Sequence, residues 1–395
     1  RSSDLHCLQQ IWAEFLQLDS QQLSVDANFF ALGGHSLLAA RVVSAIVQQG
    51  YPQCSIRRLF EQPTIVQLAA WLDQHSAVAV AVAATASPLL PAKAGVASPA
   101  QQQMWLLCQL EQQAAAYHIP LNIRLAGAVD QARLDQALLQ LISRHDILRT
   151  VYHQQQDHLV VAELPVPTTV LQYAEPGEQP ESDWLAAESD TMALAPFDLV
   201  ADYPIRAKLL YLGPQRYQLL LCLHHIAADG HALGLLLDEL AALYNGDSLA
   251  PVTISYGQYT TWLQQDDVAA ALKLQGQYWQ QQLAELPLLH QLATDFSRPA
   301  QQQYRGDIVR TELDKPILSA LTKLAVQQQT TLYQVLQSSF AILLARYSQH
   351  SDIVMGTPVA NRNEDWQQGL VGYLVNTVVV RSHIDLSHSF IAQLA

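Results

Sequence analysis

Two adjacent histidines, His224 and His225, are the residues of this chain best suited to acid–base chemistry. An acid and a glycine, Asp229 and Gly230, follow them at a short distance. Imidazole moves protons readily near neutral pH. Because adjacent strand residues point to opposite faces, one ring is expected to face a cleft and the other the opposite side. The two rings are therefore not expected to share a metal ion. We expect no metal site here, although His231 is the nearest candidate for a third ligand.

The residues around the two histidines predict the elements that position them. Residues 217–223 are almost wholly apolar and predict a strand of a buried sheet. Apolar residues then recur at helical spacing, at Leu233, Leu236, Leu237, Leu240, Leu243 and Tyr244. The histidines are thus expected on a turn between two rigid elements, which can aim a side chain into a cleft. A buried carboxylate is costly without a partner, so a structural ion pair is the expected role of Asp229.

A second candidate site is the segment formed by Gly33, Gly34, His35 and Ser36. The two glycines allow unusual backbone angles and a close approach to another surface. Ser36 falls at the start of a predicted helix, where a phosphate ester would meet the positive end of the helix dipole. The alternative is that Ser36 only caps the helix.

Composition excludes several classes of function. The 395 residues predict two or three domains. A net charge of −14 without a Lys/Arg cluster argues against nucleic acid and anionic membranes as partners. The apolar run 77–84 is too short to span a bilayer, and the chain starts without a secretory signal and is expected to be a fragment. The cysteines, Cys7, Cys54, Cys108 and Cys222, lack paired spacing, which favours a reducing cytoplasm.

Three regions of the chain differ in their residue pattern. Residues 1–75 carry amphipathic stripes and predict a small all-α bundle. Residues 76–96 are rich in Ala, Val, Pro and Ser with almost no charge, which predicts an interdomain linker. From residue 97 to 395, strands such as 119–125 alternate with helices such as 130–143, which is typical of α/β layers.

Residues 26–39, which include Ser36, resemble the four-helix peptidyl carrier domain of non-ribosomal peptide synthetases, and residues 59–65 resemble the start of its last helix. The resemblance implies that Ser36 carries 4′-phosphopantetheine, attached by a separate phosphopantetheinyl transferase. The arm would hold an aminoacyl or peptidyl thioester, and its tether would let one carrier visit several active sites. The implied partners also include an upstream adenylation domain and a downstream acceptor carrier domain.

Five ordered stretches resemble the condensation domain of the same synthetases, and together they are a specific signal. These stretches are residues 98–106, 144–150, 224–230, 256–262 and 371–377 with Arg381. The resemblance implies an α/β (α+β) fold of two lobes, each like chloramphenicol acetyltransferase. The first lobe is expected at about 97–270 and an incomplete second lobe at about 271–395.

The resemblance further implies an enzyme, an amide-bond-forming acyltransferase in which an acceptor amine attacks a donor thioester at His225, with His224 beside it. His225 acts either as general base or as a positioning group. Gly230 admits the substrate and can offer its amide to the developing oxyanion. We predict that Asp229 pairs with Arg144 or Arg149, because the second stretch supplies both arginines.

The chain departs from the family pattern in two places. His231 replaces a residue that is often bulky, and the family's last motifs do not follow residue 377 before the chain stops at Ala395. The His35 position and residues 144–149 resemble units that join two L-residues. The alternatives are a catalytically incomplete carrier and docking scaffold, or an epimerase-like relative, although Gly230 and the Val-Asn-Thr stretch favour condensation.

Overall fold

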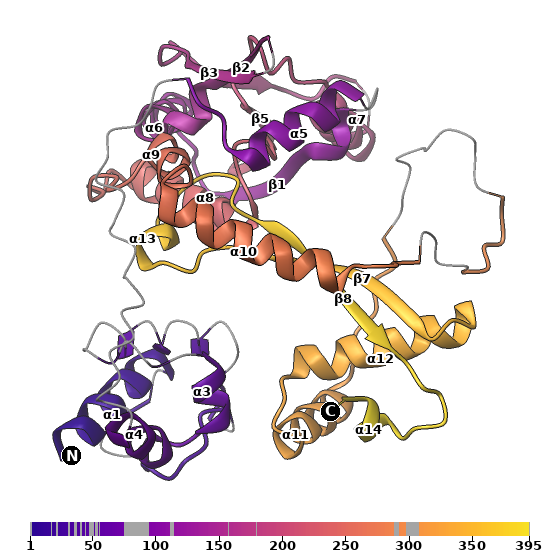
Figure 1. Cartoon of the computed structure of the whole chain (residues 1–395). Helices are drawn as coiled ribbons and strands as arrows, with labels where there is room; N and C mark the ends of the chain where they lie inside the picture. Colours follow the sequence, from indigo (N-terminus) through magenta and orange to yellow (C-terminus); the bar gives the residue numbers. More distant parts are fainter. Residues whose placement is uncertain are drawn as a thin grey trace. The chain divides into compact units, whose positions relative to one another are not determined.

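The fold is known from a computed structural model of the chain (Figure 1). The structure describes residues 2–16, 18–20, 23–30, 32–34, 38–39, 42–43, 45–46, 51, 54, 56–74, 95–110, 114–156, 158–178, 180–287, 292–297 and 308–394. The predicted linker, 76–96, falls almost wholly on residues outside this description, as do Ser36 and much of the second helix predicted from it to Gly50.

The N-terminal region is helical, as its apolar stripes predict. Its described helices are α1 (Ser2–Leu16), α3 (Ile56–Glu61) and α4 (Ile65–Gln74). Residues 38–39, 42–43 and 45–46 are helical as well. The Trp12 and Phe29 rings meet edge to face at 4.9 Å, and both side chains are fully buried. This region therefore has a core of its own.

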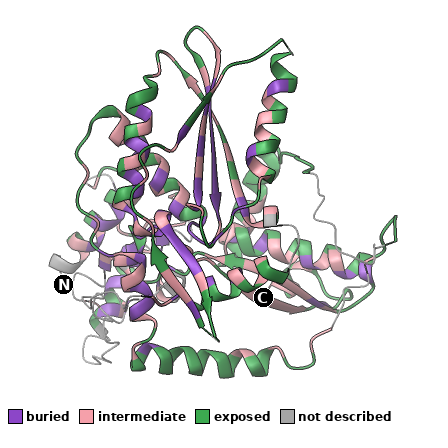
Figure 2. Ribbon diagram, turned by 90° about the horizontal axis from the view of Figure 1, so that it is seen from above, coloured by how far each residue is buried: buried purple, intermediate pink, exposed green. Residues whose placement is uncertain are grey.

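A four-stranded sheet with the order β1-β6-β5-β4 forms the centre of the next region (Figure 1). Its strands are β1 (His118–Ala126), β4 (Leu171–Ala174), β5 (Ile205–Gly213) and β6 (Arg216–His224). β6 runs antiparallel to both of its neighbours, and His118 lies opposite His224. Seven consecutive residues of β6 are buried, because both faces are covered. Figure 2 shows the buried residues gathered on these strands.

Helices cover the two faces of this sheet. Leu221 and Leu223 of β6 line one small apolar space with leucines of α6 (Gln131–Arg144) and α8 (Gly230–Asn245). His224 contacts Cys108 of α5 (Pro99–Leu110), and α7 (Glu181–Leu194) packs against β1 and β6. The predicted strand 217–223 and the helix after the histidines are thus confirmed.

The remaining elements of this region frame the sheet. The 3-10 turns η1 and η2 span Ala114–Tyr117 and Asp146–Arg149. A hairpin of β2 (Thr150–Gln155) and β3 (His158–Glu163) forms a second sheet. α9 (Tyr256–Trp262) and the long α10 (Asp266–Gln282) follow.

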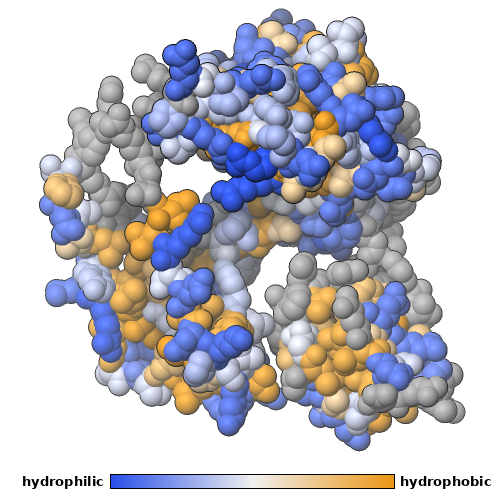
Figure 3. Space-filling model, turned by 180° about the vertical axis from the view of Figure 1, so that it is seen from behind, coloured by the Kyte–Doolittle hydropathy of each residue, from blue (hydrophilic) through white to orange (hydrophobic). Residues whose placement is uncertain are grey.

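The C-terminal elements are α11 (Lys315–Gln327), α12 (Leu332–Ser348), β7 (Asp352–Val359), α13 (Asp365–Gln368), β8 (Asn376–His383) and α14 (Phe390–Leu394). β7 pairs with β8. α12 begins at a capping box of Thr331 and Gln334, but its outer face exposes apolar side chains: Tyr333, Leu336, Phe340, Leu343 and Tyr347. Hydrophobic residues are visible over this part of the chain in Figure 3. None of the helices described here is both long and apolar enough to cross a bilayer.

The contacts divide the chain into two compact units. One joins Ser87–Ala284 to Gly356–Val378, and the other contains Arg1–Ala86, Glu285–Met355 and Val379–Ala395. The lobe boundary expected near residue 270 falls inside α10. Residues 356–378 therefore belong with the sheet that carries the two histidines.

Candidate functional site

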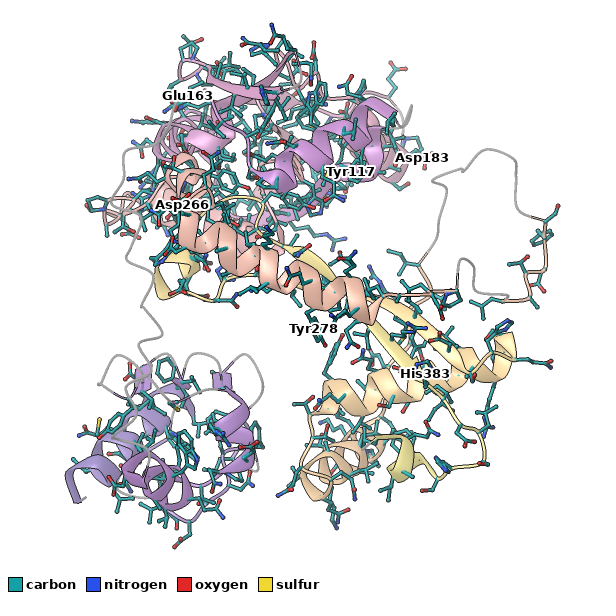
Figure 4. The ribbon with its side chains drawn as sticks, in the orientation of Figure 1. Tyr117, Glu163, Asp183, Asp266, Tyr278 and His383 are labelled. Atoms are coloured by element: carbon teal, nitrogen blue, oxygen red, sulfur yellow. The ribbon has the colours of Figure 1, made fainter. Side chains whose placement is uncertain are left out.

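The two histidines lie where β6 ends, five residues before α8 begins. His224 is the last residue of the strand and His225 the first of the turn. The His225 N–H donates to the carbonyl of Tyr117, the residue before β1, which is labelled in Figure 4 (2.8 Å). Asp229 caps α8, because its side chain accepts a hydrogen bond from the N–H of Ala232 (2.9 Å). Strand, turn and helix therefore hold the histidines, as the sequence predicts.

The His224 side chain is enclosed by neighbouring residues. Its side chain is buried, and its Nδ1 accepts a hydrogen bond from the N–H of Ile226 (3.1 Å). The proton of the neutral ring is then on Nε2, which lies 3.6 Å from the sulfur of Cys108. Burial, followed by the neighbouring imidazoles and Arg206, lowers the pKa of His224 to about 3. His224 is consequently neutral at physiological pH.

A third histidine, His118, packs beside His224. The two ring centroids are 5.8 Å apart, and the ring of Phe197 contacts both imidazoles edge to face. Nδ1 of His118 donates to the carbonyl of Ala193 (2.7 Å), and its buried Nε2 has no hydrogen-bond partner among the residues that the structure describes. Burial lowers the pKa of His118 as well. Sequence reasoning missed this residue, because a histidine at the start of a strand carries no local signal of its contacts.

His225 is half-buried and differs from His224 in the nitrogen that is left free. Its Nδ1 donates to the carbonyl of Ala228 (3.1 Å). The lone pair of the neutral ring is then on Nε2, for which no described residue provides a hydrogen bond. Burial lowers the pKa of His225, against the opposing effects of the Ala228 carbonyl and Asp229. The arrangement gives a neutral imidazole with a free acceptor nitrogen.

Asp229 is buried and fully occupied. The guanidinium of Arg362 contacts both carboxylate oxygens, at 3.1 and 3.3 Å. The N–H groups of Leu374 and Val375 donate to Oδ2 at 3.0 and 3.1 Å, and the Asp229 N–H donates to the carbonyl of Gly372 (3.1 Å). The expected structural ion pair is present, and it anchors the segment 362–375 to the start of α8.

The predicted partners of Asp229, Arg144 and Arg149, are wrong. Arg144 donates to Glu239 of α8 (3.0 Å) and to the carbonyl of Ala250. Arg149 pairs with Glu163 at the end of β3, which is labelled in Figure 4 (2.5 Å). Both arginines are therefore held by acceptors other than Asp229. Arg362, 133 residues beyond Asp229, takes the role instead, and its proximity in sequence to residues 371–377 is the only signal that pointed to it.

Gly230 is the first residue of α8, and open space surrounds the position of a Cβ there. Its N–H is one of the first-turn amides, which have no partner inside a helix. His231, the departure from the family pattern, donates a hydrogen bond from Nε2 to the carbonyl of Gln368 (2.8 Å). This contact is a second tie between α8 and the segment 362–375.

Aromatic residues hold the same segment from α9. The Tyr256 hydroxyl donates to the carbonyl of Tyr373 (2.8 Å), and Ser98 lies 3.0 Å from that hydroxyl. A Cβ at Gly372 would overlap the Tyr256 ring, so only glycine fits. The tyrosines and tryptophan of the 256–262 stretch, with Trp366, thus have a packing role.

The described residues around Ser36 fit a serine that carries a prosthetic arm. Ser36, His35 and Leu37 lie outside the described residues. Gly33 has a φ of +99°, and a Cβ at Gly34 would overlap Phe29, so both positions require glycine. The chain is helical again at Leu38 and Ala39, and Ala39 is fully buried. A glycine turn therefore precedes Ser36, and a helical segment follows it at residues 38–39.

Comparison with protein families places both regions. The model of the Condensation domain matches residues 93–395, and that of the Phosphopantetheine attachment site matches residues 8–72. The chain belongs to the condensation-domain family. A carrier domain with covalently attached 4′-phosphopantetheine precedes the condensation domain. Such a carrier implies a phosphopantetheinyl transferase and thioester substrates. Among the described residues, no group of three or more His, Cys, Asp or Glu is placed to hold a metal ion.

Peptide synthetases are among the proteins that this chain resembles. A dimodular nonribosomal peptide synthase of Bacillus subtilis (strain 168) is 35% identical over 410 residues, which cover 99% of this chain and 16% of the relative. Tyrocidine synthase 3 of Brevibacillus parabrevis is 35% identical over 379 residues, covering 95% of this chain and 6% of the relative. The chain thus spans a small part of the length of these relatives, and condensation domains of such synthetases form amide bonds.

Solved structures share the fold of the condensation domain. The X-domain from teicoplanin biosynthesis aligns with a TM-score of 0.69 and 25% identity, over 76% of this chain and 68% of that chain. The first condensation domain of the calcium-dependent antibiotic synthetase, in complex with a substrate analogue, aligns with a TM-score of 0.62 and 21% identity, over 76% and 73%. These likenesses support the chloramphenicol-acetyltransferase-like fold that the sequence predicts.

Proposed function

We propose that this chain forms an amide bond between two carrier-bound amino acids. The carrier, at about residues 1–75, presents the donor acyl group on Ser36, and the condensation domain, at about 97–395 after a linker, joins it to an acceptor amine. An upstream adenylation domain selects the donor, and a downstream carrier brings the acceptor. The spacing of Cys7, Cys54, Cys108 and Cys222, which includes no Cys-x-x-Cys pair, supports a cytoplasmic location.

The free Nε2 lone pair of His225 carries this proposal. The acceptor amine attacks the thioester carbonyl through its lone pair, and it must lose a proton as the C–N bond forms. The C–S bond of the donor thioester breaks in the same reaction, and its sulfur leaves with a proton as the thiol. The Ala228 carbonyl holds the proton of the neutral ring on Nδ1, so Nε2 can accept the amine's proton or hold the N–H in line. His224 cannot do the same, because its Nε2 is buried against Cys108. When bound, the phosphopantetheine arm supplies the thioester that activates the acyl group.

Gly230 and Asp229 support this chemistry in different ways. The open space at Gly230, and its first-turn amide, which has no acceptor among the described residues, suit the approach of a substrate carbonyl, whose oxygen gains negative charge. Asp229 fixes the turn through Arg362 and two backbone amides and has no oxygen left for proton transfer. Arg144 and Arg149 support the sheet and hairpin rather than the site.

A single-turnover assay with the whole synthetase tests the proposal. Ser36 is loaded with a radiolabelled aminoacyl arm, an acceptor-loaded carrier is added, and dipeptidyl product is measured. His225→Ala should lower the rate by about 10²–10⁴-fold, the usual range for a general base. The matched control is His158→Ala, which removes an exposed histidine of β3 and should leave the rate unchanged.

Two outcomes would contradict the proposal. A His225→Ala enzyme with the wild-type rate would show that the imidazole has no part in the reaction. A wild-type synthetase with both carriers loaded that forms no product would favour the docking scaffold instead. Loading is checked first by mass spectrometry, since a transferase should modify the wild type but not Ser36→Ala.

A further inference from the structure

Tyr373 is the residue of the segment 362–375 whose ring meets His225. The two ring centroids are 5.9 Å apart, and the planes meet at 65°, which is an edge-to-face contact. Its neighbours Val371 and Leu374 are 2% exposed and belong to the core, whereas Tyr373 is half-buried. The Tyr373 side chain therefore lies at the edge of the core, partly exposed and against the imidazole.

The backbone of Tyr373 is fixed from both sides. Asp229 bonds the residue before it, through the carbonyl of Gly372, and the residue after it, through the N–H of Leu374. The carbonyl of Tyr373 itself accepts the hydroxyl of Tyr256, which lies against Ser98. These bonds fix the backbone at Tyr373, because breaking any of them would leave a buried polar group without a partner. The ring can then leave the imidazole only by a change of its own side-chain rotamer.

The His225 ring needs such a neighbour. The Ala228 carbonyl holds Nδ1, but one hydrogen bond leaves the imidazole free to tilt about that point. An aromatic edge packed against a ring limits this tilt and excludes water from that side. The contact is between rings, because no hydrogen bond joins the two side chains in the described structure.

Building on the function proposed above, we propose that Tyr373 is a positioning residue for the reaction: its ring holds the His225 imidazole so that Nε2 faces the acceptor amine. Tyr373 acts through His225 and not through its own hydroxyl. The other groups that act on this imidazole are Asp229, neutralised by Arg362, and His224, which is itself neutral. Replacing Tyr373 therefore changes the orientation and hydration of His225 without changing the charge around it.

The test compares Tyr373→Leu with Tyr373→Phe in the full chain. Tyr373→Leu should lower the single-turnover rate by about 10²-fold, the typical cost of a misplacement of about 1 Å, with little change in the KM for the acceptor carrier. Tyr373→Phe keeps the ring and should stay within about 2-fold of the wild type, since no proton transfer uses the hydroxyl. Tyr173→Leu, on β4 of the same unit, is the control for losing a tyrosine.

A second readout separates positioning from structural damage. NMR of ¹³C,¹⁵N-labelled histidine, with the His225 signal assigned by its loss in His225→Asn, gives the pKa of that ring. Tyr373→Leu should raise this pKa towards its ordinary value, because water reaches a ring whose pKa is lowered by burial. Tyr373→Phe should leave it unchanged. If Tyr373→Leu unfolds, Tyr373→Met, which has a similar volume, carries the same comparison.

The proposal is overturned if Tyr373→Leu leaves the rate and the His225 pKa unchanged. It is also overturned if Tyr373→Phe loses as much rate as Tyr373→Leu, because the hydroxyl would then be the working group. A wild type that forms no amide bond would contradict the proposed function alone. The NMR titration would still decide whether Tyr373 fixes the imidazole.

Discussion

The two histidines at the end of β6 are held by different kinds of contact. Behind the turn, His224 packs in a neutral cluster with His118, Phe197 and the thiol of Cys108. On the side of the turn that carries the His225 ring, an ion pair and hydrogen bonds hold the chain in place. They join Asp229 to Arg362 and to the backbone of residues 372–375. One peptide bond therefore separates a packed imidazole from one with a free acceptor nitrogen.

The difference separates two tasks that a single histidine cannot combine. A fully buried imidazole is kept neutral but has no lone pair within reach of a substrate. A half-buried imidazole is reachable, but its orientation has to be fixed by other residues. The structure assigns burial to His224 and fixed orientation to His225.

The largest expected effect comes from breaking the ion pair in front of the turn. Arg362→Met leaves the Asp229 carboxylate buried without its cation, which should lower the free energy of unfolding by about 3–5 kcal/mol. Urea unfolding measures the change. Arg216→Met, which removes the exposed pair with Glu181, should change it little. Equal losses in the two variants would mean that the Asp229 pair is no more important than a surface pair.

A smaller loss is expected where the segment 362–375 meets α9. A Cβ at Gly372 would overlap the ring of Tyr256, so Gly372→Ala should destabilise the fold by about 1–3 kcal/mol through overpacking. Gly234→Ala is the control and should raise the stability of the fold. Open space surrounds this helical glycine, and alanine favours a helix over glycine by about 0.5–1 kcal/mol. Thermal unfolding of both variants checks this pair, and a neutral Gly372→Ala would rule out tight packing there.

The cluster behind the turn predicts a pH dependence of stability. His224 has a pKa of about 3 in the folded state and 6.5 without its surroundings, so the unfolded chain binds the proton first. Stability should fall as the pH drops from 6.5 towards 3, at up to about 1.4 kcal/mol per pH unit for one proton. Urea unfolding at several pH values should give a shallower slope for His224→Leu. An unchanged slope would show that burial does not keep this ring neutral.

The smallest effect is expected at Arg144, one of the two arginines that the sequence predicted as partners of Asp229. Arg144 contacts Glu239, and His145 Nε2 also lies 2.7 Å from that carboxylate. Arg144→Met should therefore lower the free energy of unfolding by about 1 kcal/mol or less and leave the single-turnover rate unchanged. A loss of single-turnover rate in a folded Arg144→Met enzyme would show that Arg144 belongs to the site after all.

Local patterns predicted the elements that hold the histidines but not the long-range pairing of their residues. The apolar run 217–223 became β6 because a strand covered on both faces needs apolar residues throughout. The leucines from Leu233 onward became α8, and Asp229 its cap, because capping depends on residues a few positions apart. Both were readable from neighbouring residues.

The partner of Asp229 could not be predicted from neighbouring residues. The sequence showed that a buried acid needs a cation, and several arginines could supply it. Only the path of residues 362–375 across the start of α8 brings Arg362 to Asp229 and the Tyr373 ring to His225. The same path explains Gly372, whose missing side chain makes room for Tyr256.

The sequence alone determined which residue types carry the chemistry, the strand and helix that hold them, and the family to which they point, because each depends on short-range spacing. The tertiary structure alone decided which imidazole is sealed and which keeps a free nitrogen. It also decided which arginine balances the buried acid. Those outcomes depend on burial and on contacts between residues more than a hundred positions apart, and local spacing carries no information about them.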